Sequence, residues 1–187
     1  MAHRHVLICG EVGAGKSTLI RRLIAESGLP VYGFFTKKLD EDRQGFHPIY
    51  LHPASQPAQT WAWTEEYLVG WCNRKSRKIY PDVFNIRGVG YLQSARPGGV
   101  IVMDELGFME TEAEPFMQAV FSALDSDIPV LAAVKARFDI PFLNAVRQHP
   151  NGQVYTITPD NRESLFQSLL PTVRAWNPLG GAVAASL

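Results

Sequence analysis

Residues 10–17 carry the stretch Gly10-Glu11-Val12-Gly13-Ala14-Gly15-Lys16-Ser17. A continuous apolar run precedes it at 6–9, and apolar residues at helical spacing follow it over 17–27. The stretch matches G-x-x-x-x-G-K-[ST], which between a strand and a helix is the signature of a phosphate-binding loop. We therefore expect a buried strand, a glycine-rich turn and a helix that begins at the phosphate site.

The chemistry of phosphate binding explains the residue types in this loop. Glycines let backbone N–H groups surround phosphate oxygens, and the helix N-terminus adds partial positive charge. Lys16 is expected to reach the β- and γ-phosphates, the Ser17 hydroxyl to ligate Mg²⁺, and Thr18 to touch the α-phosphate. The nucleotide-binding residues predicted here are Gly10, Glu11, Val12, Gly13, Ala14, Gly15, Lys16, Ser17 and Thr18.

Outward from the loop, strand and helix patterns alternate along the chain. Further strands are predicted at 31–36, 46–51, 100–103, 129–134 and 154–157, and helices at 83–95, 114–124, 141–147 and after Asp160 or Asn161. The two strands at 31–36 and 46–51 flank a polar loop with a glycine, which indicates a β-hairpin. The alternation predicts an α/β fold with a mainly parallel sheet and an added hairpin.

Two acids end the apolar run at 100–103. Asp104 has the position of an acid that holds Mg²⁺. Glu105 is offset to the other side of the strand, where it is placed to polarise the water that attacks the γ-phosphate. The alternative is that both acids only cap the following turn. The sequence thus predicts Ser17 and Asp104 as metal ligands, and Lys16 and Glu105 as catalytic residues.

The acidic pair also admits a GTPase interpretation. Residues 104–107 fit the pattern D-x-x-G, but the chain has no N-K-x-D stretch with which a GTPase reads guanine. The acids therefore favour an ATPase-like arrangement with the base supplied by the same chain.

Length and composition bound the class of protein. The chain has 187 residues, 46% of them hydrophobic, and 18 Lys and Arg balance 18 Asp and Glu. This size predicts one domain over 1–176, followed by a flexible tail at 177–187. The neutral balance argues against a nucleic acid or another polyelectrolyte as the main partner, and two cysteines cannot form a disulfide framework. No apolar run reaches the length of a membrane span or a signal peptide, so we expect a cytoplasmic protein without membrane association.

The segment 53–80 is the least regular part of the chain, and it is interpreted as a divergent insertion. It carries Trp61, Trp63 and Trp71, and a basic cluster at 74–78. Aromatic and basic residues together can bind single-stranded nucleic acid. An insertion that covers the sheet edge, with its charges in water, is the favoured interpretation.

Four blocks in order give the chain a resemblance to a known family. They are the loop at 10–17, Gly33-Phe34-Phe35-Thr36, residues 104–110 with the sequence D-E-L-G-F-M-E, and Thr158-Pro159-Asp160-Asn161-Arg162. Together with Arg43-Gln44-Gly45-Phe46, these blocks resemble the THEP-type nucleoside-triphosphatases over about 5–51 and 83–170. The resemblance implies a three-layer, RecA-like P-loop NTPase fold and Mg²⁺-dependent hydrolysis of several nucleoside triphosphates. The chain departs from the family at Glu11-Val12, where Pro-Pro is usual, and over 53–80.

Asn161 and Arg162 complete the predicted nucleotide site. They follow the last predicted strand, at the edge where α/β proteins bind ligands, and either contact the base or ribose or, for Asn161, cap the last helix. No arginine finger is evident, and the candidates are Arg77, Arg87, Arg96, Arg137 and Arg162. Hydrolysis of ATP, GTP and other triphosphates is therefore expected to be slow.

Three other functions stay open from the sequence. A small-molecule kinase would use the same phosphate loop and an acceptor pocket formed by residues 37–80. A nucleotide-binding regulatory module would bind without significant turnover, and a GTPase would prefer GTP over ATP. The sequence names no protein partner.

Overall fold

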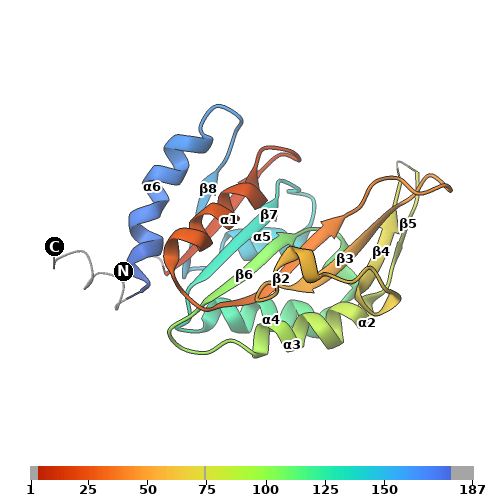
Figure 1. The fold of residues 1–187 in the computed structure, drawn as a ribbon, viewed down its shortest axis with the longest axis horizontal. Coiled ribbons are helices and arrows are strands. Elements are labelled where there is room, and N and C mark those ends of the chain that lie inside the picture. The colour runs from red at the N-terminus through yellow and green to blue at the C-terminus, as the bar shows by residue number, and fades with distance from the viewer. Residues whose placement is uncertain (1–3, 74, 178–187) are drawn as a thin grey trace.

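The computed structural model describes residues 4–73 and 75–177. Within these ranges eight strands form one sheet in the order β5-β4-β3-β2-β6-β7-β1-β8 (Figure 1). The strands are β1 (His5–Gly10), β2 (Val31–Lys38), β3 (His47–Pro53), β4 (Leu68–Cys72), β5 (Arg77–Ile79), β6 (Val100–Leu106), β7 (Val130–Lys135) and β8 (Gly152–Thr156). The predicted flexible tail lies outside the described residues, apart from Asn177.

The sheet has a parallel part and an antiparallel part. Strands β2, β6, β7, β1 and β8 run parallel to one another. Strands β3, β4 and β5 extend the sheet beyond β2 as antiparallel neighbours. The hairpin predicted from 31–36 and 46–51 is thus present as β2 and β3, and two unpredicted strands continue it.

Helices cover both faces of the sheet, as its apolar strands require. The helices are α1 (Lys16–Ser27), α2 (Pro81–Val83), α3 (Val89–Gln93), α4 (Glu114–Asp125), α5 (Pro141–Arg147) and α6 (Arg162–Ala175). Neighbouring residues of β1 show the two layers of core. Ile8 packs with Ile20 on the face of α1 and α6, whereas Leu7 packs with Phe116 on the face of α4, and all four are fully buried. This arrangement confirms the predicted three-layer α/β fold.

The helical segment predicted at 83–95 begins at Pro81 and contains a π-helical turn, Phe84–Gly88, between α2 and α3. Close packing against α4 explains the glycine at position 88. A Cβ atom there would lie 2.6 Å from the Phe116 ring, so only glycine lets α4 come this close.

Residues 53–80 contribute more than a covering loop. Two 3₁₀ turns, Ala58–Thr60 and Glu65–Tyr67, lead into β4 and β5. Trp61 is buried and packs with the core under α1. Within the described ranges, no helix combines the length and apolar character that crossing a bilayer would need.

Candidate active site

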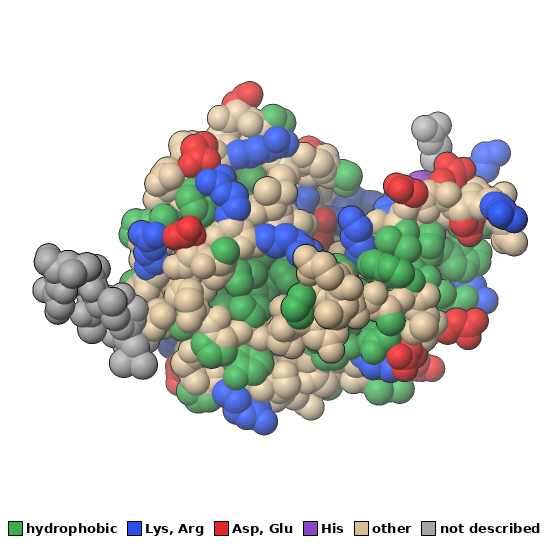
Figure 2. Space-filling model, in the orientation of Figure 1, with side chains coloured by type: hydrophobic (Ala, Val, Ile, Leu, Met, Phe, Trp, Pro, Cys, Tyr) green, Lys and Arg blue, Asp and Glu red, His purple; other side chains and the backbone are tan. Residues whose placement is uncertain are grey.

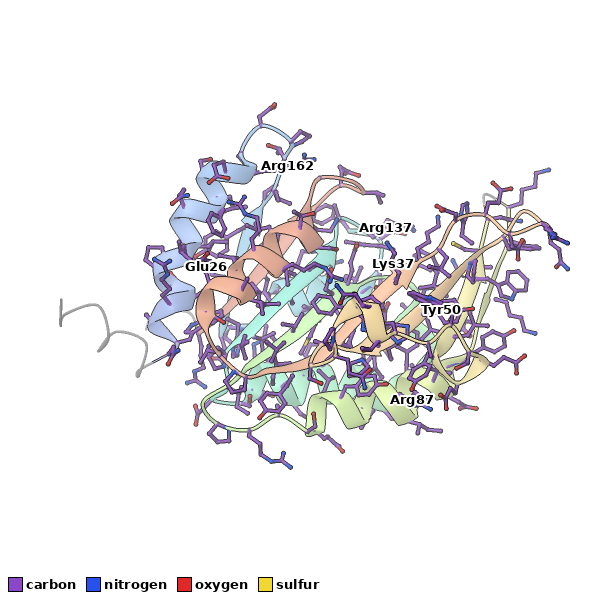
Figure 3. All side chains as sticks on the ribbon, viewed as in Figure 1. Glu26, Lys37, Tyr50, Arg87, Arg137 and Arg162 are labelled. Atoms are coloured by element: carbon purple, nitrogen blue, oxygen red, sulfur yellow. The ribbon has the colours of Figure 1, made fainter. Side chains whose placement is uncertain are left out.

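The predicted site residues meet at one edge of the sheet. Because parallel strands end at the same edge, the loop after β1, the acids that end β6 and the last residue of β7 come together there. In Figure 3, Lys37, Arg137 and Arg162 lie along this edge, while Glu26 and Arg87 lie away from it. Figure 2 shows the surface hollowed between the block that carries α1 and the arm of β3–β5, with Lys and Arg side chains around the hollow.

Glycine geometry shapes the phosphate loop. Gly15 precedes α1 in a left-handed conformation (φ 105°), and a Cβ atom there would lie 2.9 Å from Nε of Arg162. The first turn of α1 has no acidic residue, so its free N–H groups keep their attraction for an anion. The loop residues divide by exposure: Gly10, Ala14 and Lys16 are buried, Gly15 is half-buried, and Glu11, Val12, Gly13, Ser17 and Thr18 are exposed.

Hydrogen bonds to backbone carbonyls of the phosphate loop hold the Lys16 side chain in place. Its ammonium donates to the carbonyls of Gly10 (2.8 Å) and Glu11 (2.9 Å), and its side chain is only 4% exposed. Nζ also lies 3.6 Å from Oε1 of Glu105. A single cation therefore links the phosphate loop to the acidic strand.

Ser17 and Asp104 meet although 87 residues separate them. The Ser17 hydroxyl donates to Oδ1 of Asp104 at 2.8 Å. Burial raises the pKa of Asp104 to about 6, and the Ser17 hydrogen bond opposes this shift. The two predicted metal ligands thus form one cluster of oxygen atoms beside the phosphate loop.

Thr36 positions the acidic pair, a role that the sequence did not reveal. Its hydroxyl accepts from the Glu105 N–H (3.1 Å) and donates to the Asp104 carbonyl (3.3 Å). The peptide between the two acids is cis. Oε1 of Glu105 is buried and makes no hydrogen bond within the described part of the chain. This oxygen can therefore accept a proton from a ligand beside it.

A cavity of about 450 Å³ joins these groups. Its polar lining includes Ser17, Thr36, Glu105, Glu110 and the lysines Lys37, Lys38 and Lys135. Its apolar lining includes Ile49, Cys72, Phe84, Phe108 and Met109. A smaller cavity of about 190 Å³ lies on the other side of the loop, against Thr18, Arg22 and Arg162.

Comparison with known proteins agrees with this geometry. A family model described as NTPase matches residues 5–170. The chain belongs to this NTPase family. It is 28% identical to "Nucleoside-triphosphatase THEP1" of Methanocaldococcus jannaschii, covering 91% of this chain and 97% of that protein. It is 30% identical to "Cancer-related nucleoside-triphosphatase homolog" of Mus musculus, covering 92% and 97%.

The fold of this NTPase is also similar to a solved structure. The crystal structure of THEP1 from Aquifex aeolicus superposes with a TM-score of 0.69 over 90% of this chain and 98% of that chain, at 22% identity. The predicted membership of the THEP-type nucleoside-triphosphatases, and with it the enzyme class, is confirmed.

In this NTPase, Arg162 braces the phosphate loop. Its guanidinium donates to the carbonyls of Ala14 (2.7 Å) and Gly13 (2.9 Å). Asn161 bonds to its own preceding loop: its amide oxygen accepts from Thr158 N–H (2.8 Å), and its amide nitrogen donates to the Thr156 carbonyl (2.9 Å). Asn161 occupies the N-cap position of α6, as predicted, but its side chain makes no capping hydrogen bond to the helix. A contact of either residue with base or ribose stays a prediction.

None of the candidate finger arginines lines the cavity beside Glu105. Arg87 pairs with Glu66, Arg137 with Asp139, and Arg96 donates to carbonyls at the end of α3. Arg77 lies over the Phe108 ring at 5.2 Å. The partners of Arg87, Arg96 and Arg137 do not line this cavity, whereas Phe108, under Arg77, does.

Glu110 is a second buried acid beside the site. It is 2% exposed and accepts the Gly107 N–H at 2.9 Å. Burial raises the pKa of Glu110 to about 7, and the nearby charge of Lys135 opposes the shift. In the sequence, Glu110 is only the last residue of the block at 104–110. Its burial could not be predicted, because a turn has no periodic pattern that distinguishes buried from exposed residues.

Proposed function

We propose that the protein hydrolyses nucleoside triphosphates, including ATP and GTP, to diphosphate and phosphate in an Mg²⁺-dependent and slow reaction. The observation that supports this most directly is the convergence of Lys16, the Ser17–Asp104 pair and Glu105 at one end of a cavity. In the proposal, Lys16 and the amides of residues 10–18 bind the phosphates, and Asn161 and Arg162 complete the nucleotide site.

The residues present fit a magnesium ion. Hydroxyl and carboxylate oxygens are its preferred ligands, and in nucleotide sites it is held by one or two carboxylates together with phosphates. Ser17 and Asp104 already place such oxygens 2.8 Å apart. When bound, the ion would neutralise charge on the phosphate oxygens.

Glu105 is the proposed base. Its Oε1, which accepts no hydrogen bond from the described residues, would accept a proton from water as the water oxygen bonds to the γ-phosphorus and the bond to the bridging oxygen breaks. Lys16, which lies 3.6 Å from Oε1, would stabilise the charge that develops on the phosphate oxygens. Catalysis here rests mainly on positioning and charge.

One observation favours a kinase as a second candidate. The cavity continues past Glu105 to an apolar wall that includes Ile49 and Phe108, with room for an acceptor. Glu105 would then take the proton of an acceptor hydroxyl instead of water. A regulatory module would use the same contacts without turnover.

Phosphate release from ATP, GTP, CTP and UTP, measured with Mg²⁺ and with a chelator, tests the proposal. We expect release without any acceptor, only with Mg²⁺, and slower than ~10 s⁻¹, a typical enzyme median. Lys16→Met should lower the rate at least about 100-fold, as the loss of one oxyanion donor does. Lys78→Met is the matched control, since that ammonium lies over Tyr80 on β5.

Each other result points elsewhere. Release only with an added acceptor would favour the kinase, and nucleotide binding without release would favour the regulatory module. Equal rates for Lys16→Met and Lys78→Met would overturn the assignment of the phosphate loop.

A further inference from the structure

Lys135 ends β7, the strand that lies between the phosphate-loop strand and the acidic strand. Its backbone is in register with Gly10 of β1, and Val134 is in register with Leu106 of β6. The side chain therefore originates between the phosphate loop and the turn that follows Glu105. No other lysine in the described sheet ends a strand flanked by both.

Side chains along β7 alternate between the two faces of the sheet, and this alternation places Lys135 on the face that carries the phosphate loop and α1. Leu131 and Ala133 pack in the core under α1, whereas Val130, Ala132 and Val134 pack in the core under α4. Because side chains two residues apart on a strand point to the same face of the sheet, Lys135 is on the same face as Ala133. Consistent with this, it lines the same cavity as Ser17 and Glu105.

Neighbouring residues hold the lysine in place. Its ammonium lies 5.2 Å from the centre of the Phe108 ring. Its stem passes over Gly107, where a Cβ atom would lie 3.1 Å from Cδ of Lys135. Its carbonyl accepts from Arg147 at 2.7 Å. The side chain is thus braced by a ring and a glycine.

Lys135 is half-buried, and its ammonium has no charged partner within hydrogen-bond or ion-pair distance among the described residues. Across residues 4–73 and 75–177 the ammonium makes no hydrogen bond or ion pair, although Glu110 is near enough to feel its charge. Burying an unpaired cation costs free energy. An anion bound in the cavity would remove that cost, and the Lys16 ammonium lies 3.6 Å from Glu105, which lines the same cavity.

We propose that Lys135 is a catalytic residue that donates hydrogen bonds to the γ-phosphoryl oxygens in the transition state. It would supply from the same chain the charge that an arginine finger supplies in other nucleotide hydrolases. The inference rests on the proposed function and assigns a new residue to it. Lysine presents a point charge and not a planar fork, so the reaction stays slow even with this cation in place.

The test compares Lys135→Met, Lys135→Arg and the control Lys78→Met. We measure kcat and KM for the best nucleoside triphosphate with Mg²⁺, and the affinity for nucleoside diphosphate with and without aluminium fluoride, a mimic of the transferred phosphoryl group. Lys135→Met should lower kcat about 10²–10³-fold, with KM within about 3-fold of wild type. It should weaken binding of the aluminium fluoride complex and leave diphosphate binding unchanged, and Lys135→Arg should recover part of kcat.

A kcat for Lys135→Met within about 3-fold of wild type, or a higher KM at unchanged kcat, would overturn the inference. Circular dichroism melting shows whether a variant loses activity because it unfolds. If Lys135→Met unfolds, the kcat of Lys135→Arg and the binding of the aluminium fluoride complex by Lys135→Gln test the inference instead. Absence of phosphate release from the wild-type protein would instead overturn the proposed function, and this inference with it.

Discussion

The two halves of the sheet are built differently. In the parallel half, β2, β6, β7, β1 and β8 are largely apolar, and the polar residues of interest stand where these strands end. In the antiparallel half, β3, β4 and β5 are more exposed, and aromatic rings stack over β2 and β3. The comparison teaches that the proposed chemistry lies in the edge of one half, while the other half supplies packing and a cavity wall.

The aromatic cluster around Trp61 holds the antiparallel half. The Trp61 ring stacks on His52 with centroids 4.8 Å apart and packs against Phe35 of β2. His52 is 1% exposed, and burial lowers its pKa to about 4, so it is neutral near pH 7. These rings face one another inside the fold.

Two further residues of 53–80, Trp71 and Lys78, also contact aromatic rings. Trp71 packs on Phe46 at 4.2 Å, and Lys78 lies over Tyr80. This supports the interpretation of the segment as structural. Nucleic-acid binding by the basic cluster stays the less favoured interpretation.

The largest expected effect comes from truncating Trp61, which should lower the stability of the fold and leave catalysis nearly unchanged. Trp61→Ala removes a ring that is 8% exposed, and such truncations cost about 3–5 kcal/mol in the free energy of unfolding. At a temperature where the variant is folded, kcat should stay within about 3-fold of wild type, because the catalytic groups lie on other elements. Denaturant unfolding and phosphate release measure the two effects.

Trp63→Ala is the matched control, because Trp63 is 44% exposed and the variant should lose less free energy of unfolding than Trp61→Ala. If Trp61→Ala instead lowered kcat as strongly as Lys16→Met, the antiparallel half would be part of the chemistry.

A smaller effect should come from Glu110 in the parallel half. Because its pKa rises from 4.5 to about 7 on folding, the folded protein keeps a proton that the unfolded chain has lost between about pH 5 and 7. Stability therefore falls as pH rises through this range. Glu110→Gln removes this titration and keeps an oxygen for the Gly107 N–H. It should gain about 3 kcal/mol at pH 8 relative to its effect at pH 4.

Chemical unfolding of wild type and Glu110→Gln at both pH values measures this difference. An equal effect of the substitution at pH 4 and pH 8 would show that Glu110 does not titrate between them, and its burial would then carry no electrostatic cost.

Most of the parallel half could be predicted from the sequence. The spacing of residues 10–17 and the acids after an apolar run are local patterns, and the structure brings Lys16, Ser17, Asp104 and Glu105 together as expected. Strand β5, with three residues, is too short to show a periodicity, so the antiparallel extension could not be predicted beyond its first hairpin.

Thr36 and Lys135 were missed for a different reason. Each lies at or near the end of a strand, but the order of strands in the sheet differs from their order in the chain. A sequence therefore does not show that β2 and β7 both flank the acidic strand. Strand ends are a signal for such residues only once the strand order is known.

The central claim is that Glu105 acts on the attacking water, and Glu105→Gln tests it most directly. We expect the variant to bind nucleoside triphosphate within about 3-fold of wild type and to lose at least about 100-fold in phosphate release, the usual contribution of a general base. Binding by equilibrium dialysis and single-turnover phosphate release give both numbers. Phosphate release equal to that of the wild-type protein would contradict the account.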